Sequence, residues 1–165
     1  MILKSLIPAL ALAAAAAPAS AHIVLSETQA TAGGYYVAAF RVGHGCDGKP
    51  TTALSVTLPD GVTEARTQPK AGWGVRNTGS VVRWSGRLEE DQFEVFSLLV
   101  RLPNRPGPLY FPTVQTCGDV EQRWVEIPEP GQPWNSKTHP APVVTLAGPG
   151  AAAPPAASGV MQHQH

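Results

Sequence analysis

The residue best placed to do chemistry is His22, which directly follows a pattern typical of a signal-peptide cleavage site. Residues 1–21 hold one early positive charge at Lys4, an apolar run from Leu6 to Pro18, and the small-x-small pattern Ala19-Ser20-Ala21. These are the parts of a secretory signal, and the apolar run is shorter than the ~20 residues that cross a bilayer. We expect cleavage after Ala21, export across the inner membrane to the periplasm or the exterior, and a mature chain that begins with His22.

An N-terminal histidine offers two nitrogens to one metal ion, its α-amine and the Nδ1 of its imidazole. The amine has a reference pKa of about 7.7–8.0 and the imidazole of about 6.5, so both lose a proton readily at neutral pH. Copper(II) favours tetragonal nitrogen and oxygen donors and stands at the top of the divalent affinity order. The sequence therefore predicts a Cu(II) site at His22.

The chain has two cysteines, Cys46 and Cys117. In an exported protein an even pair indicates a disulfide bond. The bond would close a loop of about 70 residues and contribute ~2–4 kcal/mol to stability. A pair of soft copper ligands is the alternative interpretation.

The charge balance excludes some partners. Twelve basic and twelve acidic residues give the full chain no formal net charge, whereas nucleic-acid binding needs a basic footprint. No segment after residue 21 is long and apolar enough to span a bilayer. We expect no nucleic-acid partner and no stable membrane insertion of the mature chain.

The remaining sequence predicts an all-β protein. Its segments are short, rich in Val, Thr, Tyr, Phe and Trp, and separated by Gly and Pro. Their spacing favours a β-sandwich of the immunoglobulin or fibronectin type III kind, with a closed barrel as the main alternative. The predicted strands are 23–29, 35–42, 53–58, 62–67, 73–76, 81–85, 92–102, 109–115, 121–127 and an edge strand at 143–146.

Three segments organise the chain. Residues 1–21 form the signal peptide and residues 22–147 one sandwich domain. Within this domain, segment 128–142 holds five prolines and is expected to be a coil packed along the sandwich. Residues 148–165 are an Ala/Pro-rich tail that we expect to be disordered.

An ordered string of motifs across residues 22–146 resembles the YcnI-type copper-binding domain family. The motifs include His22-Ile-Val-Leu-Ser26, Ala32-Gly33-Gly34-Tyr35-Tyr36, Gly45-Cys46-Asp47-Gly48, Leu58-Pro59-Asp60-Gly61-Val62, Gln115-Thr-Cys117 and Trp124. The resemblance implies an exported β-sandwich that binds Cu(II) through an N-terminal histidine brace. In the family, a glutamate on the second strand and a late tryptophan complete the site.

By position, His22 matches the brace and Trp124 the late tryptophan, whereas Tyr36 stands where the family has its glutamate. His44 lies in a Gly-His-Gly turn beside Cys46 and could supply a third nitrogen, or be a plain loop histidine. Asp47 could donate an oxygen or orient His44, or be a surface-turn aspartate. Trp124 could cap the cation with its indole face, or be an ordinary core residue.

The other aromatic and histidine residues have simpler expectations. We expect Trp73 and Trp84 in the core, Trp134 as an anchor of the coil, and His139 exposed. Met161, His163 and His165 in the tail could capture copper and hand it over, or be of accidental composition.

Three functions fit these observations. The first is a copper(II)-binding protein that carries, buffers or delivers the metal outside the cytoplasm, with a copper-accepting or copper-importing protein as its partner and no catalysis. The second is a copper-dependent oxidative enzyme of the histidine-brace type, for which Tyr35 and Tyr36 could offer rings to a sugar chain. The third is a metal-free structural sandwich.

Overall fold

The structure is a computed structural model, and it describes residues 22–148. The predicted signal peptide and the predicted tail, with Met161, His163 and His165, lie outside the described residues.

Alternating burial along β3 (Tyr35–Val42) shows how the strands build the core. Every second side chain of β3 is buried, and those between are at least partly exposed. The buried set is the one that the sequence predicts: Tyr36, Ala38, Phe40 and Val42. β8 (Glu94–Arg101) lies antiparallel to β3 and places Phe96 opposite Phe40. Side chains of one strand face alternate sides, so both strands turn one apolar face to the interior.

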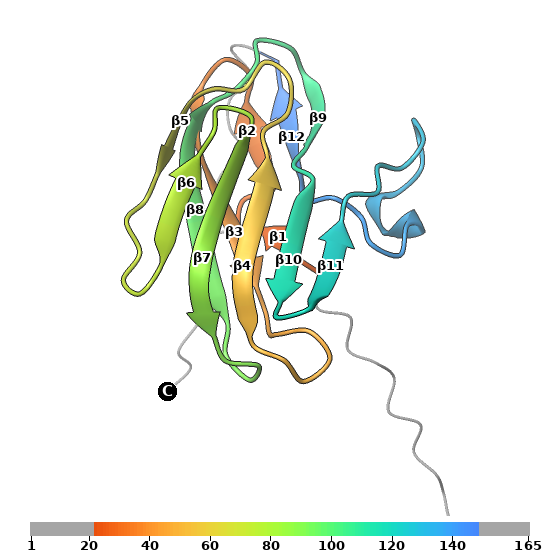
Figure 1. Cartoon of the computed structure of the whole chain (residues 1–165). Helices are drawn as coiled ribbons and strands as arrows, with labels where there is room; N and C mark the ends of the chain where they lie inside the picture. The colour runs from red at the N-terminus through yellow and green to blue at the C-terminus, as the bar shows by residue number, and fades with distance from the viewer. Residues whose placement is uncertain (1–21, 149–165) are drawn as a thin grey trace, which may run out of the picture.

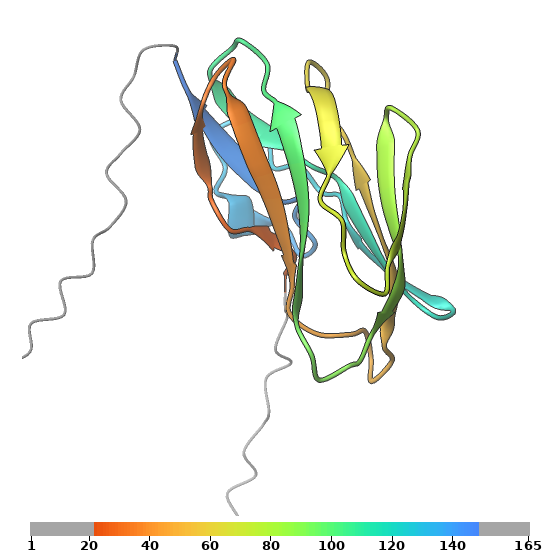
Figure 2. The same cartoon turned by 90° about the vertical axis from the view of Figure 1, so that its left-hand side faces the viewer.

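The strands form three sheets, and Figure 2 shows the main sheets as separate layers. The four-stranded sheet has the order β1 (Val24–Leu25), β3, β8 and β5 (Thr63–Thr67). The five-stranded sheet has the order β11 (Val120–Trp124), β10 (Thr113–Cys117), β4 (Thr51–Thr57), β7 (Val81–Leu88) and β6 (Gly74–Asn77). The three-stranded sheet has the order β2 (Gln29–Thr31), β12 (Val143–Ala147) and β9 (Gly107–Tyr110). The architecture is the predicted β-sandwich, not a closed barrel.

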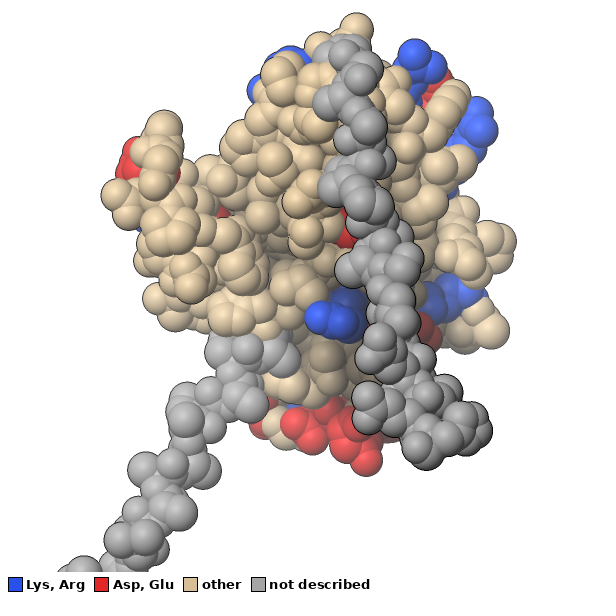
Figure 3. Space-filling view, turned by 180° about the vertical axis from the view of Figure 1, so that it is seen from behind, with Lys and Arg blue, Asp and Glu red and all other residues tan. Residues whose placement is uncertain are grey.

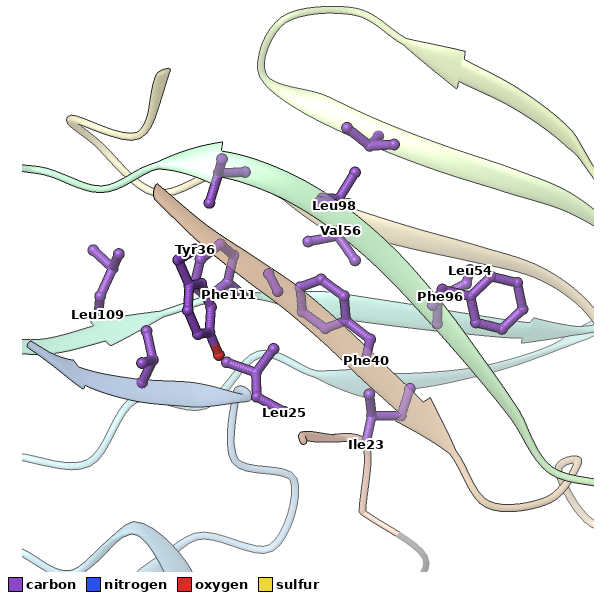
Figure 4. Packing of buried hydrophobic residues seen from close by; sticks show 14 of the residues in the cluster. Ile23, Leu25, Tyr36, Phe40, Leu54, Val56, Phe96, Leu98, Leu109 and Phe111 are labelled. Atoms are coloured by element: carbon purple, nitrogen blue, oxygen red, sulfur yellow. The ribbon is translucent and has the colours of Figure 1, made fainter. Parts of the chain in front are cut away.

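The core fills the space between the layers. Phe40 meets Phe111 edge-on, with ring centroids 5.6 Å apart, and Figure 4 shows both rings pointing into the same interior. Trp84 is fully buried, and Trp73 packs against the core through Phe96. The prediction of a core position is confirmed for Trp84, whereas Trp73 is only partly buried and packs against the core from outside.

Two predicted strands are broken where the chain changes sheets. The predicted strand 23–29 is β1 followed by β2, because β1 pairs with β3 and β2 pairs with β12. The predicted strand 109–115 is likewise divided between β9 and β10 (Figure 1). The break falls at Phe111 and Pro112, where Pro112 has no amide hydrogen to donate.

The prediction of an edge strand at 143–146 is wrong. β12 lies in the middle of its sheet, parallel to β2 and antiparallel to β9. Its buried side chains, Val144 and Leu146, explain this position, because a central strand needs an apolar face. The proline-rich segment before β12 contains no strand and carries the short 3-10 helix η1 (Trp134–Ser136).

A disulfide bond joins Cys46 to Cys117, with a Cα–Cα distance of 5.8 Å. It links the loop after β3 to the end of β10 and confirms the predicted pairing. The two cysteines are therefore not a pair of thiolate ligands.

Replacing both cysteines with alanine should lower the free energy of unfolding by about 2–4 kcal/mol, because the unfolded chain loses a cross-link over 71 residues. Urea denaturation measures the change. Reducing the unaltered protein should produce a loss of the same size. If the variant that lacks both cysteines is as stable as the parent, the cross-link does not constrain the unfolded chain.

Candidate metal centre

The start of the domain is fixed by burial of the residue after His22. Ile23 is fully buried, and Figure 4 shows it beside Phe40 in the core. β1 then pairs with β3, placing Val24 opposite Arg41. His22 lies two residues before the first paired residue of β1. His22 is half-buried and immediately precedes the four-stranded sheet in the chain.

Two tryptophans surround the His22 imidazole. Its ring centroid lies 5.2 Å from that of Trp124 and 5.4 Å from that of Trp134, with interplanar angles of 54° and 58°. Centroids at this separation are in van der Waals contact. The structure therefore brings the sequence-predicted pair His22 and Trp124 together and adds Trp134 to them.

Trp124 ends β11, where it pairs with Thr113 of β10. It is 5% exposed and belongs to the core cluster, so it is both a core residue and a wall of the candidate site. Its indole Nε1 is buried and has no hydrogen-bond partner among residues 22–148. A buried donor without a partner carries a free-energy penalty, so this N–H is suited to an acceptor that a bound ligand brings.

Trp134 lies in η1 and anchors the proline-rich coil, as predicted. Its Nε1 donates a hydrogen bond of 2.8 Å to the carbonyl oxygen of Ala141. The ring also lines an apolar pocket of about 180 Å³ together with Val24 and Val143. Trp134 thus lies where the coil faces β1 and β12, and its ring contacts His22 there.

The expectation that His139 is exposed is wrong. Its side chain is half-buried, and its ring centroid lies 5.3 Å from that of Trp124. The reason is that the coil returns to pair with the segment after β11. Glu126 donates its N–H to the His139 carbonyl at 3.1 Å, and Ala141 donates its N–H to the Glu126 carbonyl at 2.9 Å. This pairing is not encoded in any local periodicity of the sequence.

His44 is held by its own loop. Its Nδ1 lies 2.5 Å from the Gly45 carbonyl oxygen, and its own carbonyl accepts a bond of 2.8 Å from Gln115 Nε2. Gly45 is packed so tightly that a Cβ there would meet the Lys49 carbonyl oxygen at 2.0 Å. The His44 side chain is half-buried. Its loop is held in one shape by these hydrogen bonds and by the disulfide bond of Cys46.

Asp47 lies one residue beyond Cys46, on an exposed turn closed by two hydrogen bonds between Cys46 and Lys49. Its φ of 49° is in the left-handed region, which aspartate tolerates better than most residues. These features describe a turn aspartate. A role as an oxygen ligand or in orienting His44 stays a prediction.

Tyr36, which the resemblance to YcnI-type proteins places where they have a glutamate, is turned into the core. It is 7% exposed, and its hydroxyl donates a hydrogen bond to the Glu27 carbonyl oxygen. Burial raises the pKa of Tyr36 well above its usual range, and the Glu27 carboxylate raises it further. The phenol therefore stays neutral and cannot replace a carboxylate ligand.

Within residues 22–148, no three His, Cys, Asp or Glu side chains gather into a group that could hold a metal ion. In the same residues, no helix is long and apolar enough to cross a membrane.

Acidic side chains gather in one turn of the described residues. Glu89, Glu90 and Asp91 are exposed in the turn between β7 and β8, and Figure 3 shows an acidic patch at the end of the molecule where this turn lies. The turn touches the His44 loop, because Gly45 donates its N–H to the Glu90 carbonyl at 3.0 Å. Carboxylates near a loop attract cations weakly through solvent.

These features define an immunoglobulin-like β-sandwich with a histidine and two tryptophans where its first strand begins. The chain belongs to the family described as "Domain of unknown function (DUF1775)", which matches residues 22–81 and 74–146. It is also similar to an uncharacterized protein from Nocardia farcinica, whose crystal structure is described as revealing an immunoglobulin-like fold. The identity is 32%, the TM-score is 0.66, and the similarity covers 76% of this chain and 98% of that one. No curated protein matches the chain significantly.

In the protein that begins at His22, the Trp134→Leu substitution should shift the proton resonances of the His22 ring, because the ring current of a neighbouring indole is lost. It should also lower the free energy of unfolding by about 1–2 kcal/mol through the lost Ala141 hydrogen bond and ring packing. Aromatic proton–carbon spectra and urea denaturation measure the two effects. The His44 ring resonances serve as the internal control and should not move. Unchanged His22 resonances would contradict the contact with Trp134.

Proposed function

We propose that this protein binds copper(II) outside the cytoplasm, where it carries, buffers or delivers the ion, with the N-terminal His22 of the processed chain as its principal ligand. The observation that carries the proposal is the placement of the His22 imidazole against Trp124 and Trp134, with ring centroids 5.2 and 5.4 Å apart. The family match also begins at residue 22, which supports a domain that starts at this histidine.

The residues present fit a copper ion. Signal cleavage would turn the His22 backbone nitrogen from an amide into an amine, and this amine and Nδ1 can then chelate one ion. Neutral nitrogen donors suit copper(II). Burial of Ile23 fixes the backbone beside the chelate, so little chain ordering is needed on binding.

The two tryptophans would shape the site instead of donating strong ligand bonds. A neutral indole is a poor ligand, but its face attracts a cation and excludes water. The unpartnered Trp124 N–H could donate to a water or anion held by the ion. A site of this kind holds an ion near the surface, as delivery to a copper-accepting or copper-importing protein requires.

The structure weakens one argument for the enzyme alternative, the exposed aromatic surface. A copper enzyme acting on polysaccharide needs a flat aromatic surface, to which Tyr35 and Tyr36 were expected to contribute. Tyr36 is buried, and its hydroxyl is bonded to the backbone of Glu27, so only Tyr35, at 56% exposure, presents its ring. Peroxide-driven oxidation of chitin or cellulose by the copper-loaded protein would favour the enzyme over the carrier.

One added residue tests the proposal. Protein that begins at His22 should bind one Cu(II), whereas protein with a single extra alanine before His22 should bind about a hundredfold more weakly, equivalent to about 2.8 kcal/mol. The reason is that the added peptide bond removes the amine from the chelate. Competition with a chromophoric chelator measures the affinity. Quenching of tryptophan fluorescence reports binding beside Trp124 and Trp134.

The matched control is His22→Ala in the correctly processed protein, which keeps an amine but lacks the imidazole and should lose affinity similarly. Equal copper affinities for the processed protein and the extended protein would contradict a chelate at His22. Mass spectrometry of exported protein provides an independent check, since the proposal requires a chain that starts at residue 22.

A further inference from the structure

His139 lies across the same indole as His22. The imidazole centroids of His22 and His139 are 5.2 and 5.3 Å from that of Trp124, so they are separated by no more than the sum of these two distances. Both rings are tilted by 54° against the indole. The coil that follows β11 thus places a second imidazole, that of His139, against the same tryptophan that His22 contacts.

The backbone around His139 is fixed, while its imidazole is not engaged by hydrogen bonds. The His139 N–H donates to Glu126 Oε2 at 2.5 Å, and its carbonyl accepts from the Glu126 N–H. The next two residues, Pro140 and Ala141, are buried. Among residues 22–148 the ring nitrogens of His139 make no hydrogen bond, and Trp124 is the ring that it contacts. A half-buried imidazole held by its backbone in this way is available to a ligand.

We infer that His139 supplies the second imidazole of the copper site, so that one ion is held by the His22 amine, the His22 imidazole and the His139 imidazole. The inference rests on the proposed function, because it requires copper at His22. Amine and imidazole of His22 fill two positions of a tetragonal copper(II) ion and leave room for a third nitrogen. Imidazole–metal bonds are about 2.0–2.1 Å long, so a shared ion requires both side chains to rotate toward each other.

Two observations favour His139 over His44 as this donor. Nδ1 of His44 is already close to the Gly45 carbonyl oxygen, whereas His139 shares a ring contact with the principal ligand through Trp124. The buried Trp124 Nε1 without a partner lies in the ring that both imidazoles touch. An oxygen ligand on an ion held there would accept this N–H and remove an unsatisfied donor.

The experiment counts imidazoles on the bound ion. Protein that begins at His22 is loaded with one equivalent of Cu(II), and electron spin-echo spectroscopy records the remote nitrogens of coordinated imidazole. We expect two imidazoles in the parent, one in His139→Gln, and about a tenfold lower affinity for His139→Gln, equivalent to about 1.4 kcal/mol. The matched control His44→Gln should keep two imidazoles and the parent affinity. Urea denaturation of the metal-free variants verifies that each is folded.

The outcomes separate the inference from the proposed function. One imidazole in the parent, together with copper binding that depends on the free N-terminus, would overturn the role of His139 and leave the His22 chelate intact. Loss of the second imidazole in His44→Gln instead of His139→Gln would also overturn it. If copper affinity is the same with and without an extra residue before His22, both the role of His139 and the His22 chelate are wrong.

Discussion

The burial of Ile23 and the pairing of β1 with β3 are the constraint on which the rest of this structure depends. Ile23, the second of the described residues, is fully buried, and Val24 and Leu25 pair with the central strand β3. The position of His22 is therefore set by the sandwich itself. Without that anchor, the contacts with Trp124 and Trp134 would have to be formed anew whenever a ligand arrived.

The walls of the candidate site come from distant parts of the chain that the sandwich brings together. Trp124 is delivered by the edge strand β11, Trp134 by η1, and His139 by the return of the coil. The disulfide fixes the neighbouring loop independently, through Cys46 and the end of β10. Strand pairing positions Trp124, and backbone hydrogen bonds position His139, while the disulfide holds the loop that carries His44.

The features that could be predicted from the sequence are those that depend on a local residue pattern or on residue chemistry. Alternation gave the buried face of β3, and cysteine count gave the disulfide. Where packing partners decide, prediction failed. β12 was expected at an edge, but it lies between β2 and β9 and buries Val144 and Leu146 in the core. For the site, His22 and Trp124 were predicted together, whereas His139 was expected to be exposed. Its burial follows from pairing with Glu126, and a pairing between two irregular segments has no sequence period.

The pairing of Glu126 with the segment around Pro140 also divides the coil into a fixed base and a projecting middle. Trp134 is bonded back to Ala141 and so belongs to the base. The stretch from Ile127 to Gln132 lines an open surface depression, and Gly131 there has a φ of 86°, which favours glycine. Because this stretch lies outside the paired base, a change in its length should leave the ring cluster beneath in place.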